Sequence, residues 1–204
     1  CSGVCRLVIL LLALVLGACS TVRAGPPAAE KRIAFSFDDV PRQRGAFLTP
    51  DQRTEQLVAG LKRAGVRQAV FFVTPGNLAR EDGSGGEARI DSYVRAGHVL
   101  ANHSFSHRAL SAVSAEEFVA DLDRAQAWLN GRKGVRPWFR FPFLNEGRSD
   151  KAKRDTVRTA LRERRLLNAG VTADGADWHL EALTIAAARG GRAIDRAALR
   201  DLYV

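Results

Sequence analysis

Two adjacent carboxylates and a pair of imidazoles are the residues of this sequence best suited to chemistry. Asp38 and Asp39 follow the apolar run 33–37, and the stretch "ANHSFSH" supplies His103 and His107. Where a strand opens into a loop, one acid can bind a metal while its neighbour stays ionised and acts as a base. On a helical turn, two histidines four residues apart share one face and can hold one ion. These types predict a His-His-carboxylate site, a set that zinc accepts while leaving a position for water.

Each pair taken alone has a plainer interpretation. Asp favours turns, and Pro41 follows Asp39 closely, so the acid pair also fits a strand-to-loop turn. Two histidines at this spacing are more often a solvated pair than a metal site. The combination, with both pairs following predicted strands, favours the metal site.

Two further polar clusters follow later strands. Arg140 begins "RFPF", and "DGADW" contains Asp174, Asp177 and Trp178. Arg140 could pair with an active-site carboxylate or form a surface salt bridge. The acids of "DGADW" could belong to the site, or one of them could cap a helix whose Trp178 lies in the core. Four polar clusters, each at the carboxyl end of a predicted strand, are difficult to explain as separate accidents.

Strands and helices that must position these clusters alternate along the chain. Apolar runs predict strands at 33–37, 68–74, 98–102, 138–142 and 166–173. Helices are expected at about 49–64, 89–96, 114–129, 150–165 and 179–203, with a loop at 75–88. This order predicts an α/β fold with a parallel sheet, either open and doubly wound or closed as a barrel. In both architectures ligands bind at the carboxyl ends of the strands.

The N-terminal segment predicts export. Residues 7–18 form an apolar run that is too short to span a membrane and typical of a signal peptide. The run ends in "LGAC", which resembles the bacterial lipoprotein box and predicts lipid on Cys19, although an ordinary signal peptide with an unrelated Cys is the alternative. The small and Pro residues of 20–31 suit a tether. We therefore expect a signal peptide at 1–18, a lipidated Cys and tether at 19–31, and a catalytic domain at 32–204.

The positions of the cysteines and the net charge limit which metal ligands and binding partners are possible. Cys1 and Cys5 would leave with the signal peptide and Cys19 would carry lipid, so the folded part has no thiol for a disulfide or a metal. Ser20 after the lipidated Cys predicts the periplasmic side of the outer membrane in a Gram-negative cell. The net charge of the 204-residue chain is +9, but its Arg residues are dispersed, so we predict an envelope protein with a membrane anchor and no nucleic-acid partner.

In order and spacing, "SFDDV", "GHVLANHSFSH", "RFPF" and "DGADW" resemble four motifs of the polysaccharide deacetylase family, carbohydrate esterase family 4. The resemblance extends from about Ile33 to Trp178. It implies a distorted (β/α) barrel of the polysaccharide deacetylase type, incomplete in this chain. It also implies a hydrolase that uses a divalent metal, commonly zinc, to remove N-acetyl and sometimes O-acetyl groups from an acetylated polysaccharide.

The resemblance also assigns the centre of the site. By their motif positions, Asp39, His103 and His107 are similar to the metal ligands. Asp38 is similar to the general base that takes a proton from the attacking water, and Arg140 to the residue that orients this base.

Outside that centre, the resemblance assigns supporting roles. Asp174 is similar to the residue that braces the orienting arginine. The backbone N–H of Phe143 is expected to help stabilise the oxyanion. Pro142, Phe143 and Trp178 are expected to line the groove that accepts the acetyl methyl group.

Two departures from the family pattern keep other functions open. Val40 stands where the first motif usually has Gly, and no His follows His179, although the last motif of the family is Leu-x-His with the general acid. We therefore expect the sequence to stop before that motif. The alternatives are a non-catalytic glycan-binding lipoprotein on a deacetylase scaffold and a metal hydrolase acting on a small amide.

Overall fold

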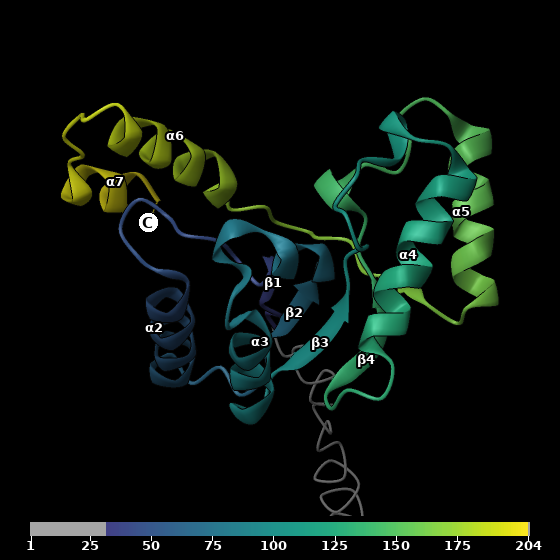
Figure 1. Ribbon diagram of the computed structural model, residues 1–204, viewed down its shortest axis with the longest axis horizontal. Helices are drawn as coiled ribbons and strands as arrows, with labels where there is room; N and C mark the ends of the chain where they lie inside the picture. The colour runs from purple at the N-terminus through teal and green to yellow at the C-terminus, as the bar shows by residue number, and fades with distance from the viewer. Residues whose placement is uncertain (1–31, 204) are drawn as a thin grey trace, which may run out of the picture. The chain divides into compact units, whose positions relative to one another are not determined.

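The computed structural model describes residues 32–203, of which those from Ala34 onward form one compact unit. The predicted signal peptide, Cys19 and the tether lie outside the described residues. Five strands form one parallel sheet in chain order (Figure 1): β1 (Ser36–Val40), β2 (Val70–Val73), β3 (Val99–Asn102), β4 (Val135–Phe139) and β5 (Leu167–Asn168). The predicted α/β fold is confirmed. Within the described residues β1 and β5 do not pair, so the barrel is not closed.

Helices connect the strands and follow the last of them. They are α2 (Pro50–Arg63), α3 (Gly86–Arg95), α4 (Ala115–Leu129), α5 (Lys151–Glu163), α6 (Asp177–Arg189) and α7 (Arg196–Tyr203). The predicted capping boxes are both present, with Thr49 and Gln52 at the start of α2 and Ser114 and Glu117 at the start of α4. Each box satisfies backbone N–H groups that the first helical turn leaves without partners. None of the helices within 32–203 has the length and apolar character needed to cross a membrane.

The two faces of the sheet differ in what they carry. Phe71 of β2 stacks on Tyr93 of α3 with ring centroids 3.8 Å apart, so this face packs against helices. Its neighbour Phe72 points to the other face, because side chains alternate along a strand. There it lies beside the His103 ring and beneath the guanidinium of Arg140. Both phenylalanines are buried, as the continuous apolar run predicts for a strand covered on two faces.

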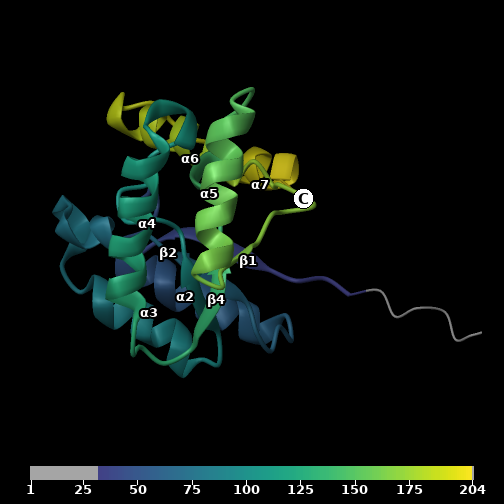
Figure 2. The same cartoon turned by 90° about the vertical axis from the view of Figure 1, so that its right-hand side faces the viewer.

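A second core lies between α4, α5 and β4. Phe118 of α4 stacks on Phe141, which in turn makes an edge-on contact with Phe139 at the end of β4. Figure 2 shows α4 and α5 side by side in front of β4. This packing fixes the end of β4 at Phe139 and therefore the position of Arg140, the next residue, beside the site.

Several element boundaries differ from the sequence-based expectation. Strand β1 begins at Ser36 and continues through the acid pair to Val40, and β4 ends at Phe139 instead of 142. Strand β5 has two residues instead of the eight expected over 166–173, since only Leu167 and Asn168 pair with β4. The predicted helix 179–203 is divided into α6 and α7, since Gly190 and Gly191 interrupt it, the latter with φ of 65°.

The segment after β5 returns across the sheet to the β1 side. In Figure 1, α6 and α7 lie above the loop between β1 and α2, far from α5. Three contacts fix this placement: Glu181 of α6 pairs with both Arg42 and Arg53, and Arg196 lies over the Phe47 ring. Helix α6 thereby comes close to the loop that follows the acid pair.

Candidate metal centre

A bulge in β1 places both acids on the same side of the sheet. Neighbouring residues of a regular strand point to opposite faces. Between Phe37 and Val40 the pairing of β1 with β2 shifts register, and Asp39 has a φ of 63°, in the left-handed region. As a result Asp38 Oδ2 lies 3.7 Å and Asp39 Oδ1 lies 3.4 Å from the same atom, Nε2 of His103.

The two histidines come from the loop that follows β3, and the expected helical turn between them is wrong. Ser104 and His107 have positive φ values, which a right-handed helix does not allow. Side chains satisfy the backbone of this loop instead: Asn102 Oδ1 accepts from the Ser104 N–H at 2.8 Å, and Asp121 Oδ2 accepts from the N–H groups of Phe105 and Ser106. The loop therefore brings both imidazoles together without a helix.

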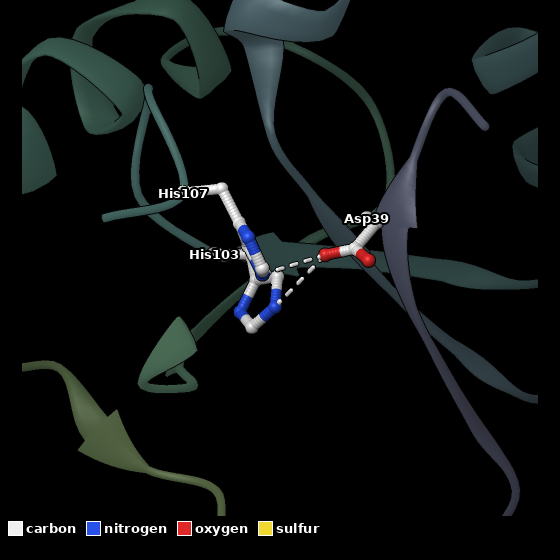
Figure 3. Close-up of side chains that lie close together, drawn as sticks. All are labelled: Asp39, His103 and His107. Carbon is white, nitrogen blue, oxygen red and sulfur yellow. Dashed lines mark ion pairs between the residues drawn. The ribbon is translucent and has the colours of Figure 1, made fainter. Parts of the chain in front are cut away.

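Asp39, His103 and His107 offer three ligand atoms that converge on one point (Figure 3). Nε2 of His107 lies 2.8 Å from Asp39 Oδ1, and the three potential ligand atoms all lie within 4.8 Å of one another. The Nδ1 atom of His103 faces the carbonyl oxygen of Arg140 at 2.9 Å, so Nδ1 carries the proton. In the neutral ring this leaves the Nε2 lone pair free to bind a metal.

The geometry of Asp39 fits a bound cation. Its Oδ1 is buried and has no hydrogen-bond partner among the described residues, because the close approach of His107 Nε2 lacks hydrogen-bond geometry. Burial by itself raises the pKa of Asp39, but the His103 and His107 rings lower that pKa by more, leaving it well below its usual range. An ionised oxygen beside two imidazole nitrogens is a donor set that accepts a divalent metal once those nitrogens are deprotonated.

Arg140 holds Asp38 beside this group. Its NH1 donates to Asp38 Oδ1 at 2.6 Å and to the Ser36 hydroxyl at 2.9 Å, and its Nε donates to the Ala169 carbonyl at 2.8 Å. The Arg140 side chain is only 6% exposed, whereas that of Asp38 is 35% exposed. The buried guanidinium thus fixes one carboxylate oxygen and leaves Oδ2 of Asp38 facing the metal-binding atoms.

Sequence reasoning did not identify Ser36 as part of this group. The available signal was the strand period: Ser36 and Asp38 are two residues apart and therefore share a face.

Asp174 is not brought to Arg140 by any contact among the described residues. Its Oδ1 accepts a hydrogen bond from the Ala176 N–H at 3.0 Å, and the side chain is exposed. Because β5 ends at Asn168, Asp174 stands in the loop beyond the strand instead of at its end. Its bracing role stays a prediction.

The three residues predicted to line the groove do not all lie in the same part of the structure. Phe143 is 67% exposed, and its ring lies 4.5 Å from that of His107, beside the metal-binding group. Pro142, the residue before it, is buried. Trp178 is 61% exposed at the start of α6, and its described ring contact is with His179. The structure thus places Phe143 at the metal-binding group, while for Trp178 a part in the groove stays a prediction.

A network of ion pairs that sequence reasoning missed connects α6 to the metal-binding group. Arg42 NH1 donates to Asp39 Oδ2 at 2.7 Å, and its NH2 pairs with Glu181, which also pairs with Arg53. Arg42 thereby occupies one oxygen of Asp39 and leaves the other, Oδ1, facing the two histidines. Asn77 adds a second restraint by donating to the Asp39 carbonyl at 3.0 Å. No local pattern reveals Glu181, because it lies 139 residues from Arg42.

Glu181 is expected to stabilise the fold at neutral pH. Burial alone raises the pKa of Glu181, but Arg42 and Arg53 lower it by more, so its pKa lies below the usual range. Its contribution is therefore present above the pKa of the unfolded chain and lost as the pH falls through the folded value. We expect Glu181→Gln to lower the free energy of unfolding by about 1–2 kcal/mol at neutral pH, or roughly 2–8 °C in Tm.

Thermal melts at neutral pH and at about pH 3.5 test this linkage, because the difference between wild type and Glu181→Gln should shrink in acid. Glu163→Gln is the matched control, since the Glu163 side chain is 70% exposed and lies 3.9 Å from Arg164. Its effect should stay within about 0.5 kcal/mol at both pH values. Equal effects of the two substitutions would contradict the role given to Glu181.

Known proteins provide an independent comparison. Residues 25–162 match the family model described as polysaccharide deacetylase, which covers more than half of the chain. A search of curated proteins found no matching sequence.

Solved structures share the fold. A family 4 carbohydrate esterase from Streptomyces lividans, in complex with acetate, gives a TM-score of 0.54 at 23% identity, covering 72% of this chain and 66% of its own. Peptidoglycan deacetylase PdaC from Bacillus subtilis gives a TM-score of 0.55 at 22% identity, and the match covers 82% of this chain and 72% of PdaC. A CE4 family pseudoenzyme from Bacillus anthracis gives a TM-score of 0.52 at 18% identity, and the match covers 74% of this chain and 47% of the pseudoenzyme. The chain thus spans slightly less than two thirds of the first of these structures, and at such identities the likeness shows the fold alone.

Proposed function

Because the chain belongs to the polysaccharide deacetylase family, we propose that it is a metal-dependent hydrolase that removes N-acetyl groups from a polysaccharide of the cell envelope or its surroundings. The observation that carries this proposal is one convergence of side chains. Asp39, His103 and His107 offer three ligand atoms at one point, and Asp38, held by Arg140, lies next to them. O-acetyl groups are a second expected target of the same chemistry.

The metal that this group suits is a divalent ion, with zinc as the proposed occupant. Zinc prefers nitrogen and oxygen ligands of this kind, and the folded residues provide no thiol. Asp39 Oδ1 and the Nε2 atoms of both histidines would hold the ion. When bound, such a metal activates water and polarises the carbonyl of the acetyl group.

Three residues of the protein support the attack of water on the acetyl carbonyl. Oδ2 of Asp38 is the oxygen left free by Arg140, so it is the atom that takes the proton from the attacking water. Arg140 keeps this carboxylate oriented. Phe143 flanks His107, where its exposed ring can contact the acetyl methyl group and its backbone N–H can help stabilise the oxyanion.

Acetate release from a panel of acetylated glycans tests this proposal directly. Peptidoglycan fragments, chitin oligomers, poly-N-acetylglucosamine and acetylxylan cover the N-acetyl and O-acetyl classes. The full-length protein is expected to release acetate from at least one of them, and to stop when a chelator removes the metal.

A non-catalytic glycan-binding protein is the second candidate. Val40, which replaces the usual Gly of the first motif, is only 2% exposed beside the acid pair and can reshape the sugar site. One of the structural neighbours is described as a pseudoenzyme. If the full-length protein binds an acetylated glycan and releases no acetate from any of the panel, this second function replaces the first.

We also propose that the protein is exported and attached to the envelope through lipid on Cys19, on the periplasmic side of the outer membrane in a Gram-negative cell. The support is the short apolar run that ends in "LGAC". Cys19→Ala should abolish palmitate labelling and move most of the protein from the membrane fraction to the soluble fraction. Cys5→Ala is the matched control and should leave both unchanged. A Cys19→Ala protein that is still labelled and membrane-bound would contradict the anchor.

A further inference from the structure

An open pocket with several arginines adjoins the metal-binding group. It has a cavity volume of about 530 Å³, a size that suits a sugar unit, and its walls include Phe143, Leu144, Glu146, Arg148, Arg154 and Arg158. We call it the arginine pocket. The Phe143 ring that forms one wall also lies 4.5 Å from the His107 ring, so the pocket and the proposed reaction site share a boundary.

The positive charge of the arginine pocket is only partly neutralised. Arg158 is paired, because its Nε and NH2 lie 2.8 and 2.6 Å from Oε2 of Glu146. The other oxygen of Glu146 accepts a hydrogen bond from Asn168. Both oxygens of the one acidic wall residue are thus occupied, and Arg148 and Arg154 must find their partners elsewhere.

Neither of these two arginines has a strong partner in the described part of the chain. Arg148 is exposed and makes no ion pair or side-chain hydrogen bond with any residue of 32–203. The nearest carboxylate to Arg154 is that of Asp155, at 3.8 Å, and Asp155 pairs closely with Lys151. Nε of Arg154 is buried without a hydrogen-bond partner. Two guanidinium groups are therefore available to an anion, and each can bind a carboxylate through two parallel hydrogen bonds.

Exposed apolar side chains stand next to this charge. Phe143 is 67% exposed and Leu144 is 45% exposed, so both present apolar surface to the pocket that they line. A sugar ring presents apolar C–H groups on its faces and polar groups at its edge. The pocket matches this chemistry, with an apolar surface at Phe143 and Leu144 and cationic groups beyond it.

We propose that the arginine pocket binds a carboxylate carried by the glycan close to the acetyl group that is removed. The substrate would then be an acidic acetylated glycan, such as one bearing a lactyl ether or a uronic acid. This inference rests on the proposed function, because it names the substrate class of the same site. It predicts that Arg148 and Arg154 determine which glycans bind, without taking part in the chemistry.

Equilibrium binding to matched glycans tests the proposal apart from catalysis. The probes are an N-acetylmuramic-acid-containing tetrasaccharide and an acetylated glucuronoxylan oligosaccharide, each as the free acid and as its methyl ester. Isothermal titration calorimetry with the full-length protein should show at least about tenfold tighter binding of one free acid than of its ester. The acid that shows this preference identifies the source of the carboxylate.

Charge-removing variants locate the effect in the arginine pocket. Arg148→Gln/Arg154→Gln should abolish the preference for the free acid and leave the affinity for the ester unchanged. Arg63→Gln is the matched control, because Arg63 is exposed at the end of α2, on the side where the strands begin, whereas the site lies where the strands end. Thermal melts of all variants show whether the fold is kept, and Arg148→Lys/Arg154→Lys should restore part of the preference.

The outcomes separate this inference from the proposed function. Equal binding of acid and ester by wild type, no binding of either acid, or equal weakening of acid and ester in the double variant would each overturn the arginine pocket as a carboxylate site. Preferential binding of an acid without acetate release supports the pocket while contradicting the hydrolase. Acetate release from neutral glycans alone supports the hydrolase and contradicts the pocket.

Discussion

The His107→Gln variant is expected to lose its metal and nearly all of its deacetylase activity. His107 supplies one of only three ligand atoms in the group, and Gln cannot reproduce an imidazole nitrogen at that position. Partners one step removed from a metal already contribute 10–100-fold in affinity, so loss of a direct ligand should weaken metal binding by about 100-fold or more. Metal analysis after dialysis and zinc titration of the apo protein measure this without relying on activity.

Two further variants protect this result against a folding artefact. His107 is chosen because its side chain is 20% exposed, whereas the His103 side chain is 1% exposed and its removal leaves a cavity. His179→Gln is the matched control, since His179 is exposed on α6 and outside the group. It should bind metal as wild type does. Equal metal occupancy in wild type, His107→Gln and His103→Ala would show that the ion is held elsewhere.

The second large effect is expected for Asp38→Asn, a variant that should keep its metal and lose most of its deacetylase activity. Loss of a general base typically lowers the rate by ~10²–10⁴-fold, about 3–5 kcal/mol of barrier. The amide keeps the shape of the side chain, and Arg140 retains its bonds to Ser36 and Ala169. We therefore expect kcat to fall while KM and metal content change little.

Substitution of the neighbouring acid, Asp39, should reduce activity by a different route. In Asp39→Asn the oxygen that faces both histidines loses its charge, so metal affinity falls first and activity falls with it. Excess zinc should restore part of the activity of Asp39→Asn and none of that of Asp38→Asn. Full activity of Asp38→Asn would show that another residue is the base and that the roles given to the two acids are wrong.

Local sequence patterns were sufficient for the type and order of most elements, though not for all of their bounds, and for most of the metal-binding group. Capping boxes at Thr49 and Ser114 predicted where α2 and α4 begin, because a cap depends on residues three positions apart. The continuous apolar run at β2 predicted a strand buried on both faces. The polar clusters at strand ends predicted that Asp39, His103 and His107 would meet, since parallel strands align their carboxyl ends.

Only the tertiary structure decided how these residues meet and what surrounds them. The acids share one side because β1 bulges against β2, and the histidines converge on a loop held by Asn102 and Asp121 instead of a helical turn. Glu181 reaches Arg42 because the chain after β5 returns across the sheet. Such contacts join residues far apart in sequence, so they depend on the packing of whole elements, whereas caps, strands and motifs depend on neighbours that the sequence itself displays.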